Sequence, residues 1–362
     1  MTSTSLRHVA ARCRPLRCVA AVLVSLAAGA AGAGTAPVCD WQLVASGRSE
    51  AFNQFRFVDP EVGFGDDGRC LWRTENGGRN WSQLPCAEAQ SPVAREGTGI
   101  AAFQFLDRQR GWLLTENSVL RASRDGGRSW SEQSFAGYIV RAFAFADDQH
   151  GWWVGEKPLS GTPDARGVIF ATADGGASWR EQPTGMATSV RWRLTDVWPI
   201  SPREAWALGD GVLLHTLDGG ASWQAPDLPK LGPRPGARIR FNATGVGVIV
   251  PSPVEQFQIS VDGGRHWQSR RPPRTAPELD GLVFVDAQQA WASMLGRVFR
   301  SGDGGRSWRA VAIGKRGAQA DVDMPAPLHS LQYLEHDGLL WVATGADGFA
   351  SCQLRLRQGS RW

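Results

Sequence analysis

Six copies of one short motif set the strongest limit on how this chain of 362 residues can fold. Each copy reads Ser/Thr-x-Asp-x-Gly-x-x-Trp, with Asn replacing Asp in the first, and the closing Trp residues lie 49, 49, 44, 44 and 41 residues apart. The paired positions are Asn76 and Trp81, Asp125 and Trp130, Asp174 and Trp179, Asp218 and Trp223, Asp262 and Trp267, and Asp303 and Trp308. Recurrence at about 40 to 50 residues is typical of repeat architectures, so the repeat outweighs any local pattern.

Each repeat predicts four short antiparallel strands. In the second repeat, residues 103–107 form the first strand, Gly111-Trp112 begins the second, and residues 118–122 form a third that runs into the motif. The motif Asp is expected to accept hydrogen bonds from backbone N–H groups of its own turn, and the paired glycines supply positive φ angles. Loss of one such Asp is expected to cost about 1–3 kcal/mol. Repeated four-stranded units describe the blades of a propeller.

The number of repeats predicts seven blades. Six blades carry the motif, and a seventh begins at residue 331 but lacks both the motif and a fourth strand. Residues 40–44 resemble a fourth strand, and Trp41 lies 40 residues before Trp81, on the repeat spacing. The sequence therefore predicts an all-β, seven-bladed propeller over residues 34–362, whose N-terminal strand closes the last blade and removes the exposed sheet edges.

Four cysteines follow residues 1–33, and the repeat suggests how they pair. Cys70 and Cys86 flank the motif turn of the first blade, while Cys39 lies on the closing strand and Cys352 on its predicted neighbour. An even number of cysteines in an exported chain indicates disulfides, here Cys70–Cys86 and Cys39–Cys352. Four buried free thiols remain the alternative.

Residues 1–33 have the pattern of a secretory signal peptide. Four arginines precede an apolar run that ends in Ala31-Gly32-Ala33, a small-x-small cleavage site. We expect an exported protein, with cleavage near Ala33 and no membrane span in the mature form. An uncleaved N-terminal anchor remains open. Removing the leader leaves 35 basic and 35 acidic residues, so the charge gives no support for nucleic-acid binding.

The sequence lacks the motifs of a metal or nucleotide enzyme. It has no HExxH, CxxC or phosphate loop, and its histidines show no metal-ligand spacing, so we predict no cofactor, no metal and no catalytic residue. Sialidases carry the same Asp motif on propellers, but they also need an arginine triad and a Tyr–Glu pair. No nearby Glu is evident for Tyr138. A glycoside hydrolase, or a glycan-binding module that uses exposed Trp153 or Trp192, remains the alternative function.

Basic residues gather in the connections opposite the Asp motifs and at the starts of the first strands. Connections on a rigid scaffold commonly carry function, and a basic mouth on a neutral protein would attract acidic segments of a partner. Ordinary solvated loop charges are the alternative. The predicted partner-binding residues are Arg141, Arg191, Arg193, Arg234, Arg238, Arg240, Arg270, Arg271, Arg274 and Arg316.

The combination of Phe-x-Phe-x-Asp-x-x-x-Gly-Trp at residues 103–112 with Asp-Gly-Gly-x-Ser-Trp at residues 125–130 resembles the photosystem II stability/assembly factor family. The resemblance extends over residues 39–356, with Asn76, Asn80 and the missing seventh motif as departures. It implies a non-enzymatic propeller, periplasmic or in a thylakoid-lumen-like space, that binds newly made membrane-protein subunits and helps their assembly. We expect a monomer.

Overall fold

The computed structural model describes residues 41–45, 52–86, 99–160, 165–186, 192–226, 236–274, 279–294, 297–311, 331–334, 337–343 and 348–353. Every regular element in these ranges is a β-strand, which confirms the all-β class. Within the same ranges, no helix is both long and apolar enough to cross a membrane. Residues Cys39–Trp362 form one compact unit, and the predicted leader lies outside the described ranges.

The strands form antiparallel sheets in which strands consecutive along the chain are hydrogen-bonded neighbours. The first two sheets are β2 (Gln54–Phe57), β3 (Gly63–Asp66), β4 (Leu71–Thr74) and β5 (Ser82–Gln83), then β6 (Ile100–Phe105), β7 (Gly111–Thr115), β8 (Val119–Ser123) and β9 (Ser131–Ser134). The next two are β10 (Ile139–Phe145), β11 (Gly151–Pro158), β12 (Ala165–Thr172) and β13 (Arg180–Glu181), then β14 (Leu194–Pro199), β15 (Ala205–Gly209) and β16 (Val212–Thr216).

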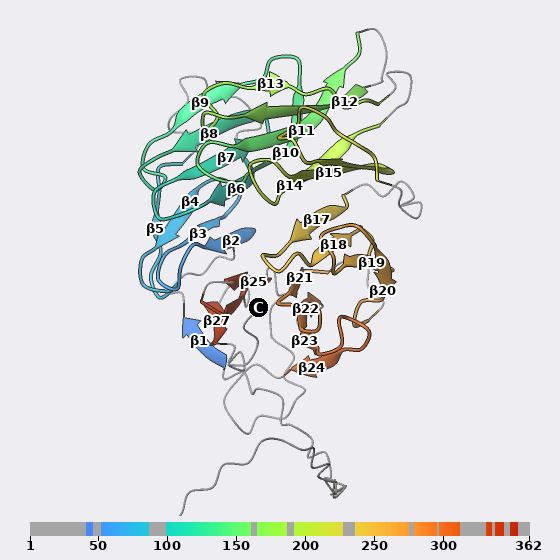
Figure 1. Ribbon diagram of the computed structural model, residues 1–362. Coiled ribbons are helices and arrows are strands. Elements are labelled where there is room, and N and C mark those ends of the chain that lie inside the picture. The colour runs from blue at the N-terminus through green and yellow to red at the C-terminus, as the bar shows by residue number, and fades with distance from the viewer. Residues whose placement is uncertain are drawn as a thin grey trace, which may run out of the picture. The chain divides into compact units, whose positions relative to one another are not determined.

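Three further sheets follow along the chain. They are β17 (Arg238–Phe241), β18 (Gly247–Val250), β19 (Phe257–Ser260) and β20 (Gln268–Arg270), then β21 (Gly281–Phe284), β22 (Ala290–Met294), β23 (Arg297–Ser301) and β24 (Arg309–Val311), and finally β25 (Leu331–Leu334), β26 (Leu339–Ala343) and β27 (Gly348–Gln353) with β1 (Trp41–Ala45). The first strands lie toward the middle of the unit, and β5, β9, β13, β20 and β24 lie toward its rim (Figure 1). This arrangement is a β-propeller.

The expectation of seven four-stranded blades needs correction. Six sheets have four strands, but in the described residues the sheet β14–β16 has three. Its fourth strand is reduced to one bridge between His215 and Gln224. Pro226 follows two residues later, and a proline has no backbone N–H with which to continue a ladder.

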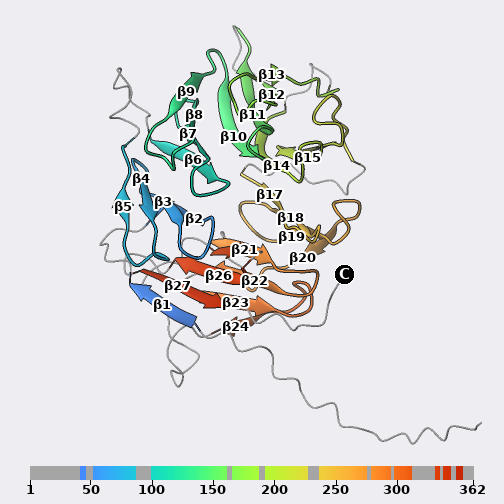
Figure 2. The same cartoon turned by 60° about the vertical axis from the view of Figure 1, so that its left-hand side comes forward.

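The last sheet is completed from the other end of the chain, as the repeat spacing predicts. Strand β1 pairs with β27, with Trp41 opposite Cys352 and Ala45 opposite Gly348. Figure 2 shows β1 beside β27 at the edge of the sheet that also contains β26. A side-chain amide joins the same sheet to the first one, because Gln332 accepts from the N–H of Phe57 (2.7 Å) and donates to its carbonyl (2.8 Å). The strand assignment is confirmed.

The motif turns are stabilised as the sequence predicts. In the second blade, the Asp125 carboxylate accepts from the backbone N–H (2.9 Å) and hydroxyl (2.6 Å) of Ser129. Gly126 and Gly127 adopt φ angles of 74° and 87°, which glycine enters without steric cost. The Trp130 indole N–H donates to the carbonyl of Gly127 and closes the turn. Asn76 performs the same role in the first blade, where it accepts from the N–H of Asn80 (2.9 Å).

Aromatic side chains fill the space between neighbouring blades. Trp112 of one blade stacks on Phe145 of the next, with ring centroids 3.7 Å apart. Phe64 and Phe105 stack in the same way at 3.5 Å. Glycine begins β7 and β11 because the rings of Phe105 and Phe145 occupy the space that a Cβ at Gly111 or Gly151 would need. The repeated Gly-Trp step therefore packs blades against each other.

One predicted disulfide is present. Cys70 and Cys86 are bonded, with their Cα atoms 4.4 Å apart, and they fasten the start of β4 to the segment that follows β5. Cys39 lies outside the described residues, so the second pairing stays a prediction, although β1 and β27 are neighbouring strands.

Candidate functional site in the central channel

A cavity of about 330 Å³ lies where the first strands meet. Residues of β2, β6, β10, β14 and β17 line it, together with Gln332 of β25. In these strands every second side chain faces a neighbouring blade and the alternate ones face the channel. Arg56, for example, lies between the buried rings of Phe55 and Phe57, and Arg240 lies between Ile239 and Phe241.

Three of the inner strands contain a β-bulge at their entry to the channel. The register of β6, β10 and β14 shifts around Ala101, Arg141 and Thr195, and all three residues line the cavity. A bulge inserts one extra residue and turns its side chain away from the regular alternation. In β10 the bulge therefore places an arginine at the channel.

Gly155, on the strand opposite the β10 bulge, allows this bend. A Cβ at this position would lie 1.9 Å from the carbonyl oxygen of Ile139, so only glycine fits the close backbone approach. The next residue, Glu156, is buried with 3% of its surface exposed. The bulge and the glycine together bring Glu156 against the bulged Arg141.

Two buried carboxylates hold the arginines on one side of the channel. Glu156 accepts from Nε (2.7 Å) and Nη2 (2.6 Å) of Arg141, and its second oxygen lies 3.3 Å from Nε of Arg193. Asp196, on β14, accepts from Nη1 of Arg240 (2.6 Å) and from the backbone N–H of Ile239 (2.7 Å). A buried carboxylate requires such partners, because removing them would leave an uncompensated charge.

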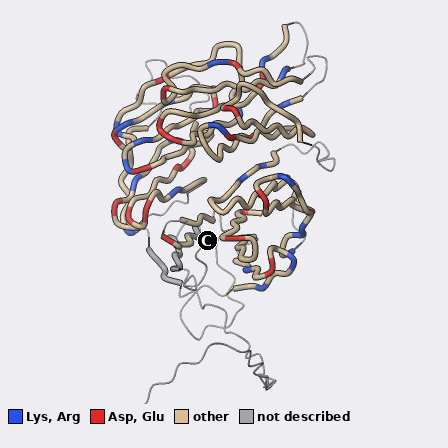
Figure 3. The backbone as a smooth tube through the Cα atoms, viewed as in Figure 1, with Lys and Arg blue, Asp and Glu red and all other residues tan. Residues whose placement is uncertain are grey.

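Two other channel arginines have no such partner. Among the described residues, neither Arg56 of β2 nor Arg238 of β17 forms an ion pair, and both side chains are exposed where they line the cavity. Solvent reaches Arg56, but the walls of the cavity enclose it, and this partial loss of solvation, then repulsion from Arg240 and Arg238, lowers the pKa of Arg56 to about 10, while Asp196 opposes the shift. The guanidinium remains charged at neutral pH. Basic segments on β2 and β17 are visible in Figure 3.

The predicted basic residues fall into separate groups. Arg141, Arg238 and Arg240 line the channel, and Arg193 reaches the same place through Glu156. Arg270 lies on β20 at the rim, where its Nε donates to the carbonyl of Gly304 in the next blade (3.3 Å). Arg271 and Arg274 follow it outside the channel lining. Arg191, Arg234 and Arg316 lie outside the described residues.

Sequence reasoning missed Arg56 and Glu156. The signal for Arg56 was available, because Gln54-Phe55-Arg56-Phe57 has the same alternation as Arg238-Ile239-Arg240-Phe241. No sequence pattern marked Glu156, whose role depends on the bulge in the strand beside it.

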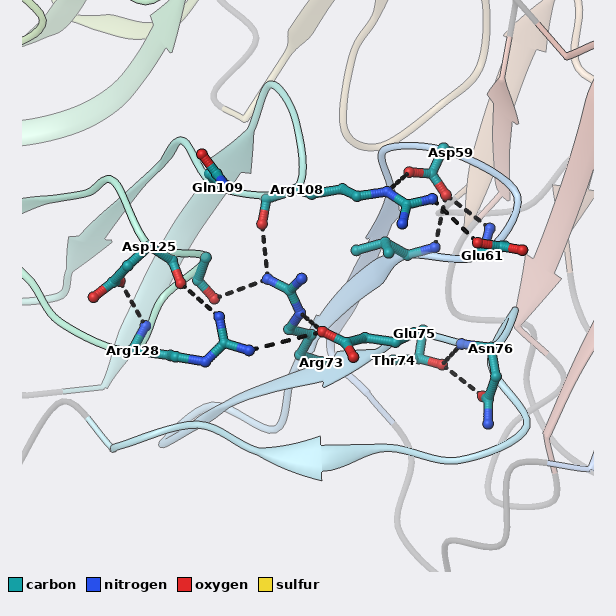
Figure 4. Close-up of polar contacts among 12 residues, drawn as sticks. Asp59, Glu61, Arg73, Thr74, Glu75, Asn76, Arg108, Gln109, Asp125 and Arg128 are labelled. Carbon is teal, nitrogen blue, oxygen red and sulfur yellow. Dashed lines mark hydrogen bonds and ion pairs between the residues drawn. The ribbon is translucent and has the colours of Figure 1, made fainter.

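The face that carries the motif turns differs from the channel, because charged side chains of its first two blades pair with one another. Figure 4 shows Arg108 against Asp59 and Glu61, with N–O distances of 2.7 Å and 3.2 Å. In the same view, Arg73 donates to Glu75 (2.9 Å) and to the carbonyl of Arg108 in the next blade (2.7 Å). These contacts join the first two blades.

Two expectations about glycan sites were wrong. Trp153 is fully buried and stacks on Phe170 at 4.2 Å, and Trp192 is 3% exposed, so neither indole can stack on a sugar. Tyr138 does have a glutamate nearby, since its hydroxyl lies 3.4 Å from Glu181, a residue of the rim strand β13. Tyr138 and Glu181 are not among the residues that line the channel.

No metal site is found in the part of the chain that the structure describes. The carboxylate of Asp66 accepts from the N–H of Gly68 (3.0 Å), and Asp67 accepts from the N–H of Cys70 (2.8 Å). Both aspartates therefore shape their own turn.

Comparison with known proteins agrees with this fold. The family model described as Photosynthesis system II assembly factor YCF48 matches residues 136–248. The chain resembles the photosystem II assembly factor family. The Photosystem II assembly lipoprotein Ycf48 of Synechococcus sp. (strain CC9902) is 26% identical over 142 residues, which cover 37% of this chain and 38% of that relative. The resemblance read from the motifs is confirmed.

Solved structures show the same fold at low identity. The structure described as YCF48 bound to D1 peptide has a TM-score of 0.59 and 15% identity, and covers 90% of this chain and 100% of that one. An ancestral GH74 enzyme also matches, with a TM-score of 0.58 and 14% identity over 86% of this chain and 46% of that one. Propellers of this kind therefore include both peptide-binding and enzymatic proteins.

Proposed function

We propose that this protein is an exported, non-enzymatic assembly factor whose channel binds an acidic segment of a partner protein. The observation that carries the proposal is the pair Arg56 and Arg238, two channel guanidinium groups without a carboxylate partner among the described residues. An unpaired guanidinium offers a fork of donors that suits a carboxylate.

The similar proteins support this proposal. The family match covers the third and fourth sheets and β17 of the fifth, which supply Arg141, Asp196, Arg238 and Arg240 to the channel. One solved propeller of this fold is described as bound to D1 peptide. We infer a membrane-complex subunit, or its soluble loops and termini, as the partner class.

The proposal also includes the number of blades and the cellular compartment of the protein. We infer that the three-stranded sheet β14–β16 occupies one position in a ring of seven blades, since it carries the motif of Asp218 and Trp223 on the repeat spacing. The leader pattern supports export, to the periplasm or a lumen-like compartment. The buried Trp153 and Trp192 give no support to the glycan alternative.

The test is capture of partners from solubilised host membranes by the tagged mature protein, read by mass spectrometry. The wild type is compared with Arg56→Gln/Arg238→Gln and with a control, Arg180→Gln/Arg309→Gln, which removes two exposed rim arginines. We expect a membrane-protein subunit that the wild type and control enrich and the channel variant loses at least about tenfold. Equal capture by all three proteins would contradict channel binding.

A further inference from the structure

Two buried acids, Glu156 and Asp196, pair with some of the channel arginines and leave others without an ion pair among the described residues. Glu156 and Asp196 are 3% and 5% exposed, and each lies on a strand of the third or fourth sheet. They fix Arg141, Arg193 and Arg240, whereas Arg56 and Arg238 remain open. The channel is therefore a small open anion site beside arginines that already have acidic partners.

We propose that Glu156 and Asp196 are positioning residues that set ligand specificity, by restricting the channel to a segment that presents one carboxylate rather than a run of acidic groups. The inference rests on the proposed function, because it concerns the same channel. In this proposal a single carboxylate pairs with Arg56 and Arg238, which both line the cavity. Further acidic groups would meet Arg141, Arg193 and Arg240, whose positive charge Glu156 and Asp196 already offset in large part, so these groups would gain little attraction there.

Geometry supports this role for Glu156 over a purely structural one. The glutamate is supplied by β11 after the Gly155 contact, and it reaches arginines from two different elements, the β10 bulge and the segment before β14. Both arginines are more than two-fifths exposed on their side chains, although Glu156 is only 4% exposed. The carboxylate thus lies behind the arginines and faces the ligand only through them.

The ligand surface has few other polar groups that could reverse this preference. Gln54, Gln104, Gln332 and Thr195 line the cavity, and the side chain of each forms at least one hydrogen bond with the backbone. Charge on the arginines and on the two acids therefore dominates selection in the channel.

Glu156→Gln keeps the shape of the side chain and removes its charge, so it tests the proposal directly. Two fluorescein-labelled peptides of equal length serve as probes, one with a single glutamate and one with a run of glutamates. Their dissociation constants are measured by anisotropy at low and moderate salt. A control, Glu132→Gln, removes one negative charge from the Arg121 ion pair on the second blade, away from the channel.

We expect the wild type and Glu132→Gln to gain little affinity from the extra glutamates of the polyacidic peptide. In Glu156→Gln the polyacidic peptide should gain about tenfold in affinity relative to the other, with a steeper salt dependence. Asp196→Asn should shift the preference in the same direction, and provides a second route if Glu156→Gln folds poorly.

Two results would overturn the inference, and they differ in what they say of the channel. If the wild type binds both peptides and the ratio of the two affinities is unchanged in Glu156→Gln and Asp196→Asn, the specificity role is wrong and the proposed function stands. If the wild type binds neither peptide, the proposed acidic ligand is wrong and the inference falls with it.

Discussion

The motif turns and the channel mouth use charged side chains in opposite ways. At each motif the Asp finds its partners within a few residues, as Asp174 does with the N–H and hydroxyl of Ser178. At the channel, Glu156 binds arginines 15 and 37 residues away in sequence, and Arg56 has no acidic partner in the described ranges. Because each motif turn forms its hydrogen bonds within a few residues, the same turn can recur in every blade that carries the motif. The ion pairs of the channel do not recur, so they make one side of the channel different from the other.

The largest effect should come from breaking the bulge that serves the channel. In Gly155→Ala the new Cβ would meet the carbonyl oxygen of Ile139 at 1.9 Å, and backbone cannot yield as a flexible side chain can. We expect a loss of about 3 kcal/mol in the free energy of unfolding, measured by denaturant titration. Gly302→Ala is the control, since no heavy atom lies within 4 Å of its Cβ. Equal stability of the two variants would contradict the strained contact.

A smaller effect should follow from breaking one motif turn. Asp125→Ala leaves the N–H groups of Arg128 and Ser129 without their acceptor. Because this turn is partly exposed, water replaces some of the lost bonds, and we expect about 1 kcal/mol, the lower end of the sequence-based expectation. Asp125→Asn should cost much less, as Asn76 already serves in the first blade. Thermal unfolding measures both, and peptide binding in the channel should not change in either.

The smallest effect on stability is expected from acid titration, which protonates all motif carboxylates together. In Asp174 the hydroxyl of Ser178, then its backbone N–H, lowers the pKa to about 2, and Asp218 and Asp303 are alike. A depressed folded pKa means that this stability is present above the unfolded pKa of 3.8 and is lost as pH falls toward 2. Burial raises the pKa of Asp66 to about 6, so its protonation favours folding as pH falls from 6 to 4.

Melting temperature measured against pH should therefore be steady or rise slightly from pH 6 to 4 and fall from pH 4 to 2. In Asp66→Asn the upper part of this profile should be flat, because the titrating group is gone. A melting temperature that stays constant between pH 4 and 2 would show that the motif hydrogen bonds do not depend on the ionised carboxylate.

Much of the fold could be predicted from the repeat, because the hydrogen bonds that stabilise each motif turn form between residues close in sequence. A turn with Asp, two glycines and Trp satisfies its own donors, so its presence identifies a blade without knowledge of the neighbours. The spacing of Trp41 from Trp81 also predicted the closing strand, and the positions of Cys70 and Cys86 around one turn predicted their bond. The reduced fourth strand after Trp223 was missed, although Pro226 offered a signal.

The channel could be predicted only in part. Arg141, Arg238 and Arg240 were expected near the starts of first strands, and that is where they line the cavity. Whether an arginine is paired depends on which acid lies on the neighbouring strand or blade, and the repeat pattern does not mark the position of that acid. Trp153 shows the same limit, since its burial against Phe170 comes from the neighbouring strand within its blade and not from its own repeat position.

The sequence by itself determined the all-β repeat, the turn chemistry and the ring closure, because each follows from contacts within one repeat or from the spacing between repeats. Only the tertiary structure decided which arginines stay open. The β10 bulge, Gly155 and the buried Glu156 act together across strands, and electrostatic pairing depends on distance in space and on burial, not on order along the chain.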